Sequence, residues 1–166
     1  MAYQFYAKIR GQKSGAIAGS VTQKGRENQI ACFAITHSIV SPRDPASGLP
    51  TGRRQHKPIV ITKAWDKSTP VLLNSLFTNE VLVDCQFLFW RSQVAAGIGV
   101  AGEVQYMTIE LTNASIASID QYTASPDQLN QFNANDLEDI SFTYQKIIIT
   151  YNDGGITAQD DWQAQV

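Results

Sequence analysis

The chain has 166 residues, 43% of them hydrophobic and 17% charged, which is too apolar a composition for an intrinsically disordered protein. Its net charge of -2 argues against a nucleic-acid partner, and no apolar run reaches the ~18 residues that insertion into a membrane as a helix requires. One hydrophobic core typically serves ~100 to 200 residues, so residues 1–166 are expected to form a single domain.

The start of the chain favours a β-strand over an export signal. Residues 1–8 (MAYQFYAK) alternate aromatic and polar side chains. A secretory signal peptide would begin with basic residues and continue with about 7 to 15 apolar ones. If the protein leaves the cell, we therefore expect it to do so without a cleavable signal peptide.

Short runs rich in β-branched and aromatic residues recur along the chain, several of them with alternating polarity. They predict about eight strands, near residues 3–10, 18–22, 30–39, 58–63, 82–91, 104–111, 114–121 and 140–151. Many short strands separated by turn residues favour a barrel or sandwich over a parallel α/β sheet. The predicted fold is therefore mainly β, an antiparallel β-barrel.

One segment differs in its periodicity. Residues 66–80 place four apolar side chains on one helical face, namely Leu72, Leu73, Leu76 and Phe77. Thr69 before Pro70 predicts the helix start, with the threonine as N-cap, and Asn79 is a plausible stop. We expect one α-helix over about residues 69–79, flanking the barrel.

Two segments read as long loops. Residues 41–57 (SPRDPASGLPTGRRQHK) contain three prolines and two glycines with almost no hydrophobic residues, so they cannot belong to the core. Loops longer than ~12 to 15 residues are usually functional or disordered. Residues 122–139, rich in Asn, Gln and Asp, are the second predicted loop.

Several motifs suggest chemistry but have simpler interpretations. Residues 97–102 spell Gly-x-Gly-x-x-Gly, yet a strand-like run follows where dinucleotide binding needs a helix, so a glycine-rich hairpin loop is favoured. Cys32 and Cys85 lie in apolar runs and are expected to be buried and reduced. His37 and His56 have no metal-ligand spacing, and a nucleophile motif is absent, although a triad assembled in space stays open.

Arg53, Arg54 and Lys57 form the one basic cluster, and it lies in the first long loop. Single-strand nucleic-acid sites interleave such charges with aromatic residues, which are missing here. Arginine is enriched at protein interfaces and pairs well with carboxylates. A polar interface contact is therefore the favoured interpretation.

Several segments along the chain together form a recognisable order. A Gly-Arg-x-x-His loop at residues 52–56 precedes a strand ending Ile-Thr-Lys at Lys63, and then a helix that opens with Asp66 and Thr69-Pro70. A later strand covers residues 141–151 (SFTYQKIIITY). This order resembles the Hcp family, the tube proteins of bacterial type VI secretion systems, whose last core strand residues 141–151 resemble. Residues 19–21, 27–30 and 153–162 also fit. Two loops, 92–102 and 122–139, match no family motif.

The resemblance implies a non-enzymatic structural subunit without cofactor or metal. It implies hexameric rings that stack into a tube, assemble in the bacterial cytoplasm and are expelled by a contractile sheath behind a spike protein. Small effector proteins are implied to ride in the lumen. The projecting loop 41–57 is implied to contact a neighbouring subunit or the next ring, with these candidate interface residues: Arg43, Asp44, Leu49, Arg53, Arg54, His56 and Lys57.

Two other functions are weighed against the tube subunit. A non-polymerising β-barrel that binds a carbohydrate or peptide would need an aromatic-lined concave surface, and Trp65, Trp90 and Trp162 are dispersed in sequence. A hydrolase is weaker still, because no nucleophile motif is present.

Overall fold

The computed structural model describes residues 5–94, 101–123 and 136–163. These residues form twelve strands and one helix, in the order β1 (Phe5–Gly11), β2 (Gly15–Ile17), β3 (Ile30–Cys32), β4 (Ala34–Thr36), β5 (Ile39–Val40), β6 (Gln55–His56), β7 (Ile59–Ala64), α1 (Thr69–Phe77), β8 (Leu82–Val94), β9 (Ala101–Tyr122), β10 (Leu137–Thr143), β11 (Lys146–Tyr151) and β12 (Ile156–Asp161). The predicted mainly β class with a single flanking helix is confirmed for the described residues.

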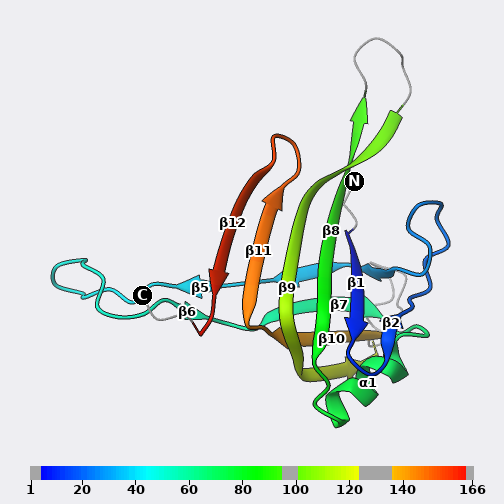
Figure 1. Ribbon diagram of the computed structural model, residues 1–166, viewed down its shortest axis with the longest axis horizontal. Helices are drawn as coiled ribbons and strands as arrows, with labels where there is room; N and C mark the ends of the chain where they lie inside the picture. Colours follow the sequence, from blue (N-terminus) through cyan, green and yellow to red (C-terminus); the bar gives the residue numbers. More distant parts are fainter. Residues whose placement is uncertain (1–4, 95–100, 124–135, 164–166) are drawn as a thin grey trace.

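Ten of these strands belong to one sheet, and β5 with β6 forms a separate two-stranded hairpin. The main path runs β2-β1-β8-β9-β10-β7-β4, every pairing in it is antiparallel, and β11 and β12 extend from β9. Figure 1 shows β8, β9, β11 and β12 side by side as an upright layer, with β7 and β10 crossing at its foot. The helix α1 lies beside that foot.

The long strand β9 connects the two parts of the sheet. Its first half pairs with β8 and β11, and its second half pairs with β10. Asn113 has a positive φ of 49° between the halves, a conformation that asparagine tolerates better than most residues. The predicted strands 104–111 and 114–121 are thus one bent strand. Conversely, the predicted strand 140–151 is two strands, because the chain turns a corner at Tyr144 and Gln145.

Residues 30–36 connect the two edges of the main path. β3 pairs with β1 and β4 pairs with β7, and Phe33 between them donates its N–H to the Thr62 carbonyl at 2.8 Å. One segment therefore bridges both edges of the curved sheet. Among the described strands, no paired ladder joins β2 to β4, so the structure shows a strongly curved antiparallel sheet and not the closed barrel that was predicted.

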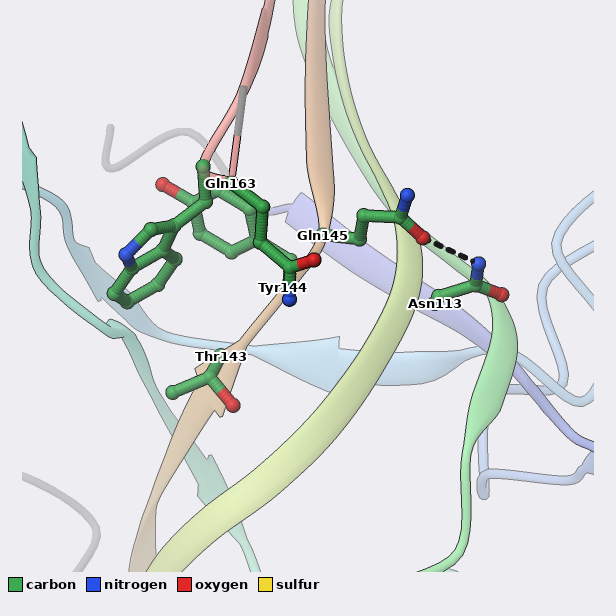
Figure 2. A pocket seen from close by; sticks show the side chains of 6 residues that line it. Asn113, Thr143, Tyr144, Gln145 and Gln163 are labelled. Atoms are coloured by element: carbon green, nitrogen blue, oxygen red, sulfur yellow. Dashed lines mark hydrogen bonds between the residues drawn. The ribbon is translucent and has the colours of Figure 1, made fainter. Parts of the chain in front are cut away.

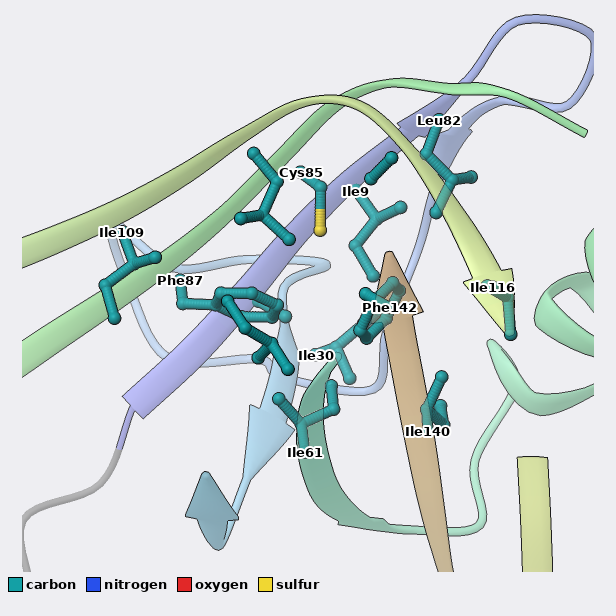
Figure 3. Close-up of a cluster of buried hydrophobic side chains, with 14 of the residues drawn as sticks. Ile9, Ile30, Ile61, Leu82, Cys85, Phe87, Ile109, Ile116, Ile140 and Phe142 are labelled. Atoms are coloured by element: carbon teal, nitrogen blue, oxygen red, sulfur yellow. The ribbon is translucent and has the colours of Figure 1, made fainter. Parts of the chain in front are cut away.

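The core lies inside this curve because alternate residues of each strand point inward. β7 and β10 alternate strictly between buried and partly exposed positions, and β1 does so over most of its length. Figure 3 shows side chains from the upright layer and from the crossing strands meeting in one cluster, including Ile9, Ile30, Ile61, Leu82, Phe87, Ile109, Ile116, Ile140 and Phe142. Cys32 and Cys85 are both buried and free, as predicted.

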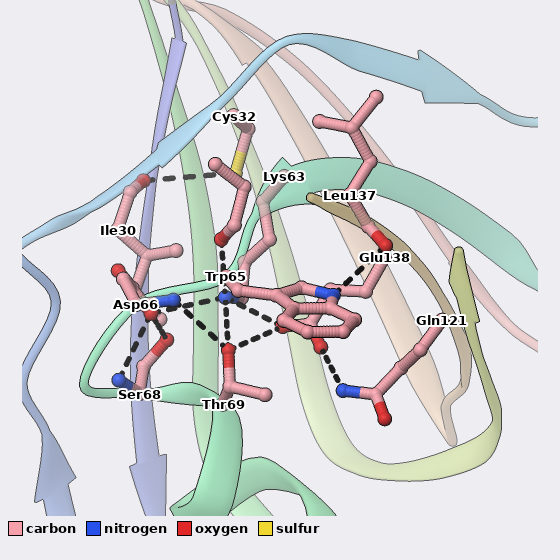
Figure 4. Close-up of polar contacts among 11 residues, drawn as sticks. Ile30, Cys32, Lys63, Trp65, Asp66, Ser68, Thr69, Gln121, Leu137 and Glu138 are labelled. Carbon is pink, nitrogen blue, oxygen red and sulfur yellow. Dashed lines mark hydrogen bonds and ion pairs between the residues drawn. The ribbon is translucent and has the colours of Figure 1, made fainter. Parts of the chain in front are cut away.

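A buried polar network attaches α1 to the sheet. Lys63 of β7 and Glu138 of β10 are both fully buried, and the Lys63 ammonium lies 2.6 Å from a Glu138 carboxylate oxygen. The same ammonium lies 3.0 Å from the Asp66 carboxylate and 3.1 Å from the Thr69 hydroxyl. Gln121 donates to the second Glu138 oxygen at 3.0 Å. Figure 4 shows these groups converging on the start of the helix.

The prediction of Thr69 as N-cap was wrong, because Ser68 is the N-cap and Thr69 is the first helical residue. The Thr69 hydroxyl instead accepts the Asp66 N–H and donates to the buried Glu138 carboxylate. It therefore does not accept an N–H from the first turn of the helix, as an N-cap hydroxyl would. The predicted stop is confirmed: Asn79 has a φ of 49° just past the helix and donates its N–H to the Leu76 carbonyl.

The predicted strand at residues 18–22 was also wrong. Gly19 donates its N–H to the Asn28 carbonyl at 2.7 Å, and a side chain at this position would overlap the Gln29 backbone. The segment therefore folds back onto residues 28–29 as an irregular loop that only glycine permits. The single strand predicted at 30–39 was wrong as well, because that segment is divided into β3, β4 and the first residue of β5. β2, β6 and β12 were not predicted, since they are short or lack a regular apolar alternation.

The remaining loop predictions fall partly outside the described residues. Of the glycine-rich segment, residues 97–100 lie outside, but the residues from Ala101 onward form β9, which confirms a strand after the motif. Of the loop predicted at 122–139, residues 124–135 lie outside, and 137–139 belong to β10. In the described part of the chain, no helix is long and apolar enough to cross a membrane.

Candidate functional site

The loop predicted at 41–57 is a projecting β-hairpin arm, which we define as residues 39–57. β5 and β6 pair at its base, and Arg43 and Pro50 form a further bridge near its tip. Asp44 shapes the tip: its carboxylate accepts the Ser47 N–H at 3.0 Å, and its N–H donates to the Leu49 carbonyl at 2.9 Å. Figure 1 shows the arm extending away from the sheet at one end of the long axis.

The base of the arm is attached to the last strand by two basic side chains. Arg54 forms an ion pair with Asp160 of β12 and donates to the Asp161 carbonyl at 3.2 Å. The His56 side chain is fully buried, and its Nε2 lies 2.7 Å from the same Asp160 carboxylate. These hydrogen bonds hold the pKa of Asp160 below its usual range, with the Arg54 bond as the largest cause.

A chain of hydrogen bonds continues from His56 through Tyr144 to His37. The Tyr144 hydroxyl lies 2.8 Å from His56 Nδ1 and 3.0 Å from His37 Nε2. With His56 donating from Nε2 to Asp160, its Nδ1 accepts the Tyr144 proton, and the Tyr144 oxygen then accepts from His37. Burial, followed by the neighbouring His56, lowers the pKa of His37.

Aromatic packing covers this chain of hydrogen bonds. Trp162, just after β12, stacks on His56 with ring centroids 5.5 Å apart and meets Tyr144 edge-on at 5.0 Å. A shallow cavity of about 380 Å³ lies beside Tyr144 and Trp162. Figure 2 shows the neutral side chains that also line it, Asn113, Thr143, Gln145 and Gln163. Asn113 donates a hydrogen bond to Gln145 at 2.8 Å, so two of the polar side chains that line the cavity already have a hydrogen-bond partner in the chain.

The arrangement is suited to holding the arm and offers no activated nucleophile. The hydroxyl between the two histidines belongs to Tyr144, and burial followed by the nearby Asp160 charge raises its pKa to about 12. Such a hydroxyl stays protonated at neutral pH. Within the described residues, no three His, Cys, Asp or Glu side chains gather as a metal site would require.

The seven candidate interface residues separate into two groups. Arg54 and His56 face their own chain at the base of the arm, and Asp44 is engaged in the tip turn. The other four side chains are exposed along the arm, namely Arg43, Leu49, Arg53 and Lys57. Sequence reasoning missed Tyr144, Asp160 and Trp162 as partners of His56, because nothing local in the sequence indicates which distant groups meet.

The three tryptophans do not share a surface. Trp162 packs at the arm base, Trp90 lies under the Arg26 guanidinium at 3.9 Å, and Trp65 donates its indole N–H to the Leu137 carbonyl at 2.9 Å. An aromatic-lined binding face of the kind that a sugar-binding barrel needs is therefore not formed by these side chains.

Replacing Tyr144 by phenylalanine is expected to loosen the arm without unfolding the sheet. The change removes the hydroxyl that joins the two histidines and leaves the buried His56 Nδ1 and the partly buried His37 Nε2 without that partner, at a cost of about 1–3 kcal/mol. Hydrogen exchange should speed up selectively in residues 37–57. Tyr122→Phe, which removes an exposed hydroxyl elsewhere, is the matched control, and equal exchange in both variants would contradict the role of Tyr144.

Comparisons with known proteins agree with this architecture. The family model described as "Type VI secretion system effector, Hcp" matches residues 6–151. The chain is 37% identical over 175 residues to the "Major exported protein" of Pseudomonas aeruginosa, covering 100% of this chain and 99% of the relative.

Solved structures are similar over almost the whole chain. One, described as an Hcp protein, has a TM-score of 0.87 at 26% identity and covers 99% of this chain and 100% of its own. Another, the secreted protein Hcp3 from Pseudomonas aeruginosa, has a TM-score of 0.77 at 30% identity and covers 98% and 100%.

Proposed function

Because the chain belongs to the Hcp family of type VI secretion proteins, we propose that it is a structural subunit of the secretion tube that assembles into hexameric rings. The observation that carries this proposal is the family match over residues 6–151, joined to a fold similar to Hcp structures over nearly the whole chain. Stacking of the rings would form the tube. No catalytic step is part of this function.

The anchored arm supports the proposal that the protein functions by self-assembly. An exposed hairpin held by an ion pair, a buried histidine and stacked rings keeps its shape before any partner arrives. Binding then orders few additional side chains, which lowers its entropic cost. A head-to-tail ring needs two unlike surfaces on each subunit, and a projecting arm can provide one of them.

The proposed partners follow from the same assignment. They are further copies of this chain, a spike protein at the tube tip, the contractile sheath and small effector proteins in the lumen. Assembly would take place in the bacterial cytoplasm, followed by secretion. The name of the Pseudomonas relative, a major exported protein, supports the secretion step.

Electron microscopy of the purified protein tests the proposal. Rings with a central hole are the expected result. Only monomers over a wide concentration range, together with crystals that contain no rings, would contradict it.

Shortening the arm is expected to abolish ring stacking or secretion and to leave the fold intact. Residues 43–50 can be replaced by Asn-Gly, since the Thr51 N–H already donates to the Pro42 carbonyl at 3.0 Å, which is the bond that closes a two-residue hairpin. Arg54 and His56 remain in place, so we expect a thermal midpoint within about 3 °C of the wild type. Normal tube assembly and secretion of this variant would show that the arm is not needed for assembly.

A further inference from the structure

The hydrogen bonds at the base of the arm depend on where the protons of two histidine rings lie. The Tyr144 hydroxyl lies 2.8 Å from His56 Nδ1 and 3.0 Å from His37 Nε2. Because its pKa is raised to about 12, the hydroxyl keeps its proton and brings it to one of these two hydrogen bonds. Both bonds therefore form only when one of the two facing ring nitrogens carries a proton and the other does not.

One added proton is compatible with this arrangement. If the proton enters at His56 Nδ1, that ring donates to Tyr144, and Tyr144 donates in turn to His37 Nε2 while His37 keeps its own proton on Nδ1. The charged His56 ring is then held by the Asp160 carboxylate at 2.7 Å and by the stacked Trp162 ring, with centroids 5.5 Å apart. The order of the hydrogen bonds reverses, and every bond is kept.

A second added proton is not compatible with it. Both facing ring nitrogens then donate, and the Tyr144 hydrogen has no acceptor between them. These two nitrogens lie within about 6 Å of each other, because both bond the same oxygen, and two positive charges at that distance repel. Two protonated rings therefore cannot both keep their hydrogen bond to Tyr144.

The surroundings offer no further carboxylate to offset a second cation. The charged side chains on the segments that pack around the two rings are Arg54 and Lys57 of the arm, Asp160 and Asp161 of β12, and Lys146 at the start of β11. Asp160 already pairs with Arg54 and His56, and the Asp161 carboxylate accepts the Gln163 N–H at 2.8 Å. Burial, followed by the neighbouring His56, lowers the pKa of His37, so both causes oppose its charged form.

The two histidines lie on the two strands of the arm at its base. Ile39 of β5 pairs with His56 of β6, and His37 lies two residues before Ile39. The Lys57 N–H donates to the Ser38 carbonyl at 3.0 Å, which continues the pairing toward the sheet. Repulsion between the two rings therefore acts on both strands where the arm is attached.

We propose that the base of the arm is an acid-sensitive latch, which holds the arm while His37 and His56 share at most one added proton and releases it when both rings are protonated. The latch goes beyond the proposed function, since it belongs to the folded chain whether or not rings form. The pKa of His37 is lowered from 6.5, so its contribution to stability is present above pH 6.5 and is lost as the pH falls through the lowered pKa. In an acidic compartment the arm, and any contact made through it, would loosen.

Hydrogen exchange of the purified protein at pH 7.5 and pH 5 tests the latch. After correction for the intrinsic exchange rate at each pH, the protection of residues 37–57 should fall about tenfold at pH 5, while β8 and β9 keep theirs. The contribution of Glu80 is lost only below pH 4.5, so it does not account for a change at pH 5. Unchanged protection of residues 37–57, or an equal fall in β8 and β9, would overturn the inference.

His37→Gln is the matched variant. Glutamine offers an N–H donor to the Tyr144 oxygen but takes up no proton, so the arm should keep its protection at pH 5. A thermal midpoint within about 3 °C of the wild type at pH 7.5 checks the fold, and an equal loss of protection in variant and wild type would overturn the role of the second proton. Rings in microscopy together with an arm that stays protected at pH 5 would overturn the latch alone. Monomers with an arm that loosens in acid would overturn the proposed function alone.

Discussion

Replacing Lys63 by methionine is expected to lower the free energy of unfolding by about 3–5 kcal/mol, because it leaves the Glu138 carboxylate buried without its cation. Neither side chain of this pair is exposed to solvent. The remaining donors to Glu138 are Thr69 and Gln121, which are neutral and cannot replace an ammonium. Chemical denaturation at pH 7 measures the loss.

Two further variants make the Lys63 prediction specific. Lys63→Met/Glu138→Gln removes the unpaired charge and should recover a large part of the lost stability. Lys67→Met, at an exposed lysine on the same connection, should change the free energy of unfolding by less than about 0.5 kcal/mol. A loss below about 1 kcal/mol for Lys63→Met would show that the buried pair does not carry the attachment of α1.

Acid is expected to destabilise the protein through Glu80, and Glu80→Gln should remove that part of the pH dependence. Glu80 follows α1 and is only 4% exposed. Its carboxylate accepts the backbone N–H groups of Lys13 and Ser14, each at 2.6 Å, and the hydroxyls of Ser14 and Ser75. The Ser14 hydroxyl is the largest cause that lowers the pKa of Glu80 from 4.5 to about 2.

The sign of the effect follows from the lowered pKa. Because the folded state binds the Glu80 proton more weakly than the unfolded state, the stabilisation is complete above pH 4.5 and is lost as the pH falls toward 2. A fall in pKa of this size corresponds to at most about 3 kcal/mol. Denaturation at pH 6 and pH 3 should show a smaller loss of stability in Glu80→Gln than in the wild type. Glu110→Gln, on the outward face of β9, serves as control, and a loss in Glu80→Gln equal to that of the wild type would contradict the prediction.

Local patterns in the sequence predicted the parts of the fold that depend on one segment. The helix was predicted because four apolar residues share a face, and β7 because its alternation is regular. β12 could not be predicted in this way: four of its six residues are exposed, and it pairs only with β11 in the described chain. The bend in β9 depends on the different strands that pair with its two halves. The sequence of β9 alone does not indicate which strands these are.

The family motifs have structural explanations that the sequence alone could not supply. Lys63, Asp66 and Thr69, from the strand ending and the helix opening, meet in the buried network around Glu138. His56 and Tyr144, more than eighty residues apart, meet at the base of the arm. The arm itself was predicted as a surface element. Its sequence did not distinguish Arg54 and His56, which attach the arm to the chain, from its exposed residues, because their partner Asp160 lies more than a hundred residues away.

The central claim, that this chain works by closing into hexameric rings, is tested most directly by the mass of the assembled species in solution. Native mass spectrometry of the wild-type protein should show a dominant species of about 110 kDa, six times the 18.3 kDa chain. A single species at the monomer mass across a wide concentration range would contradict the claim.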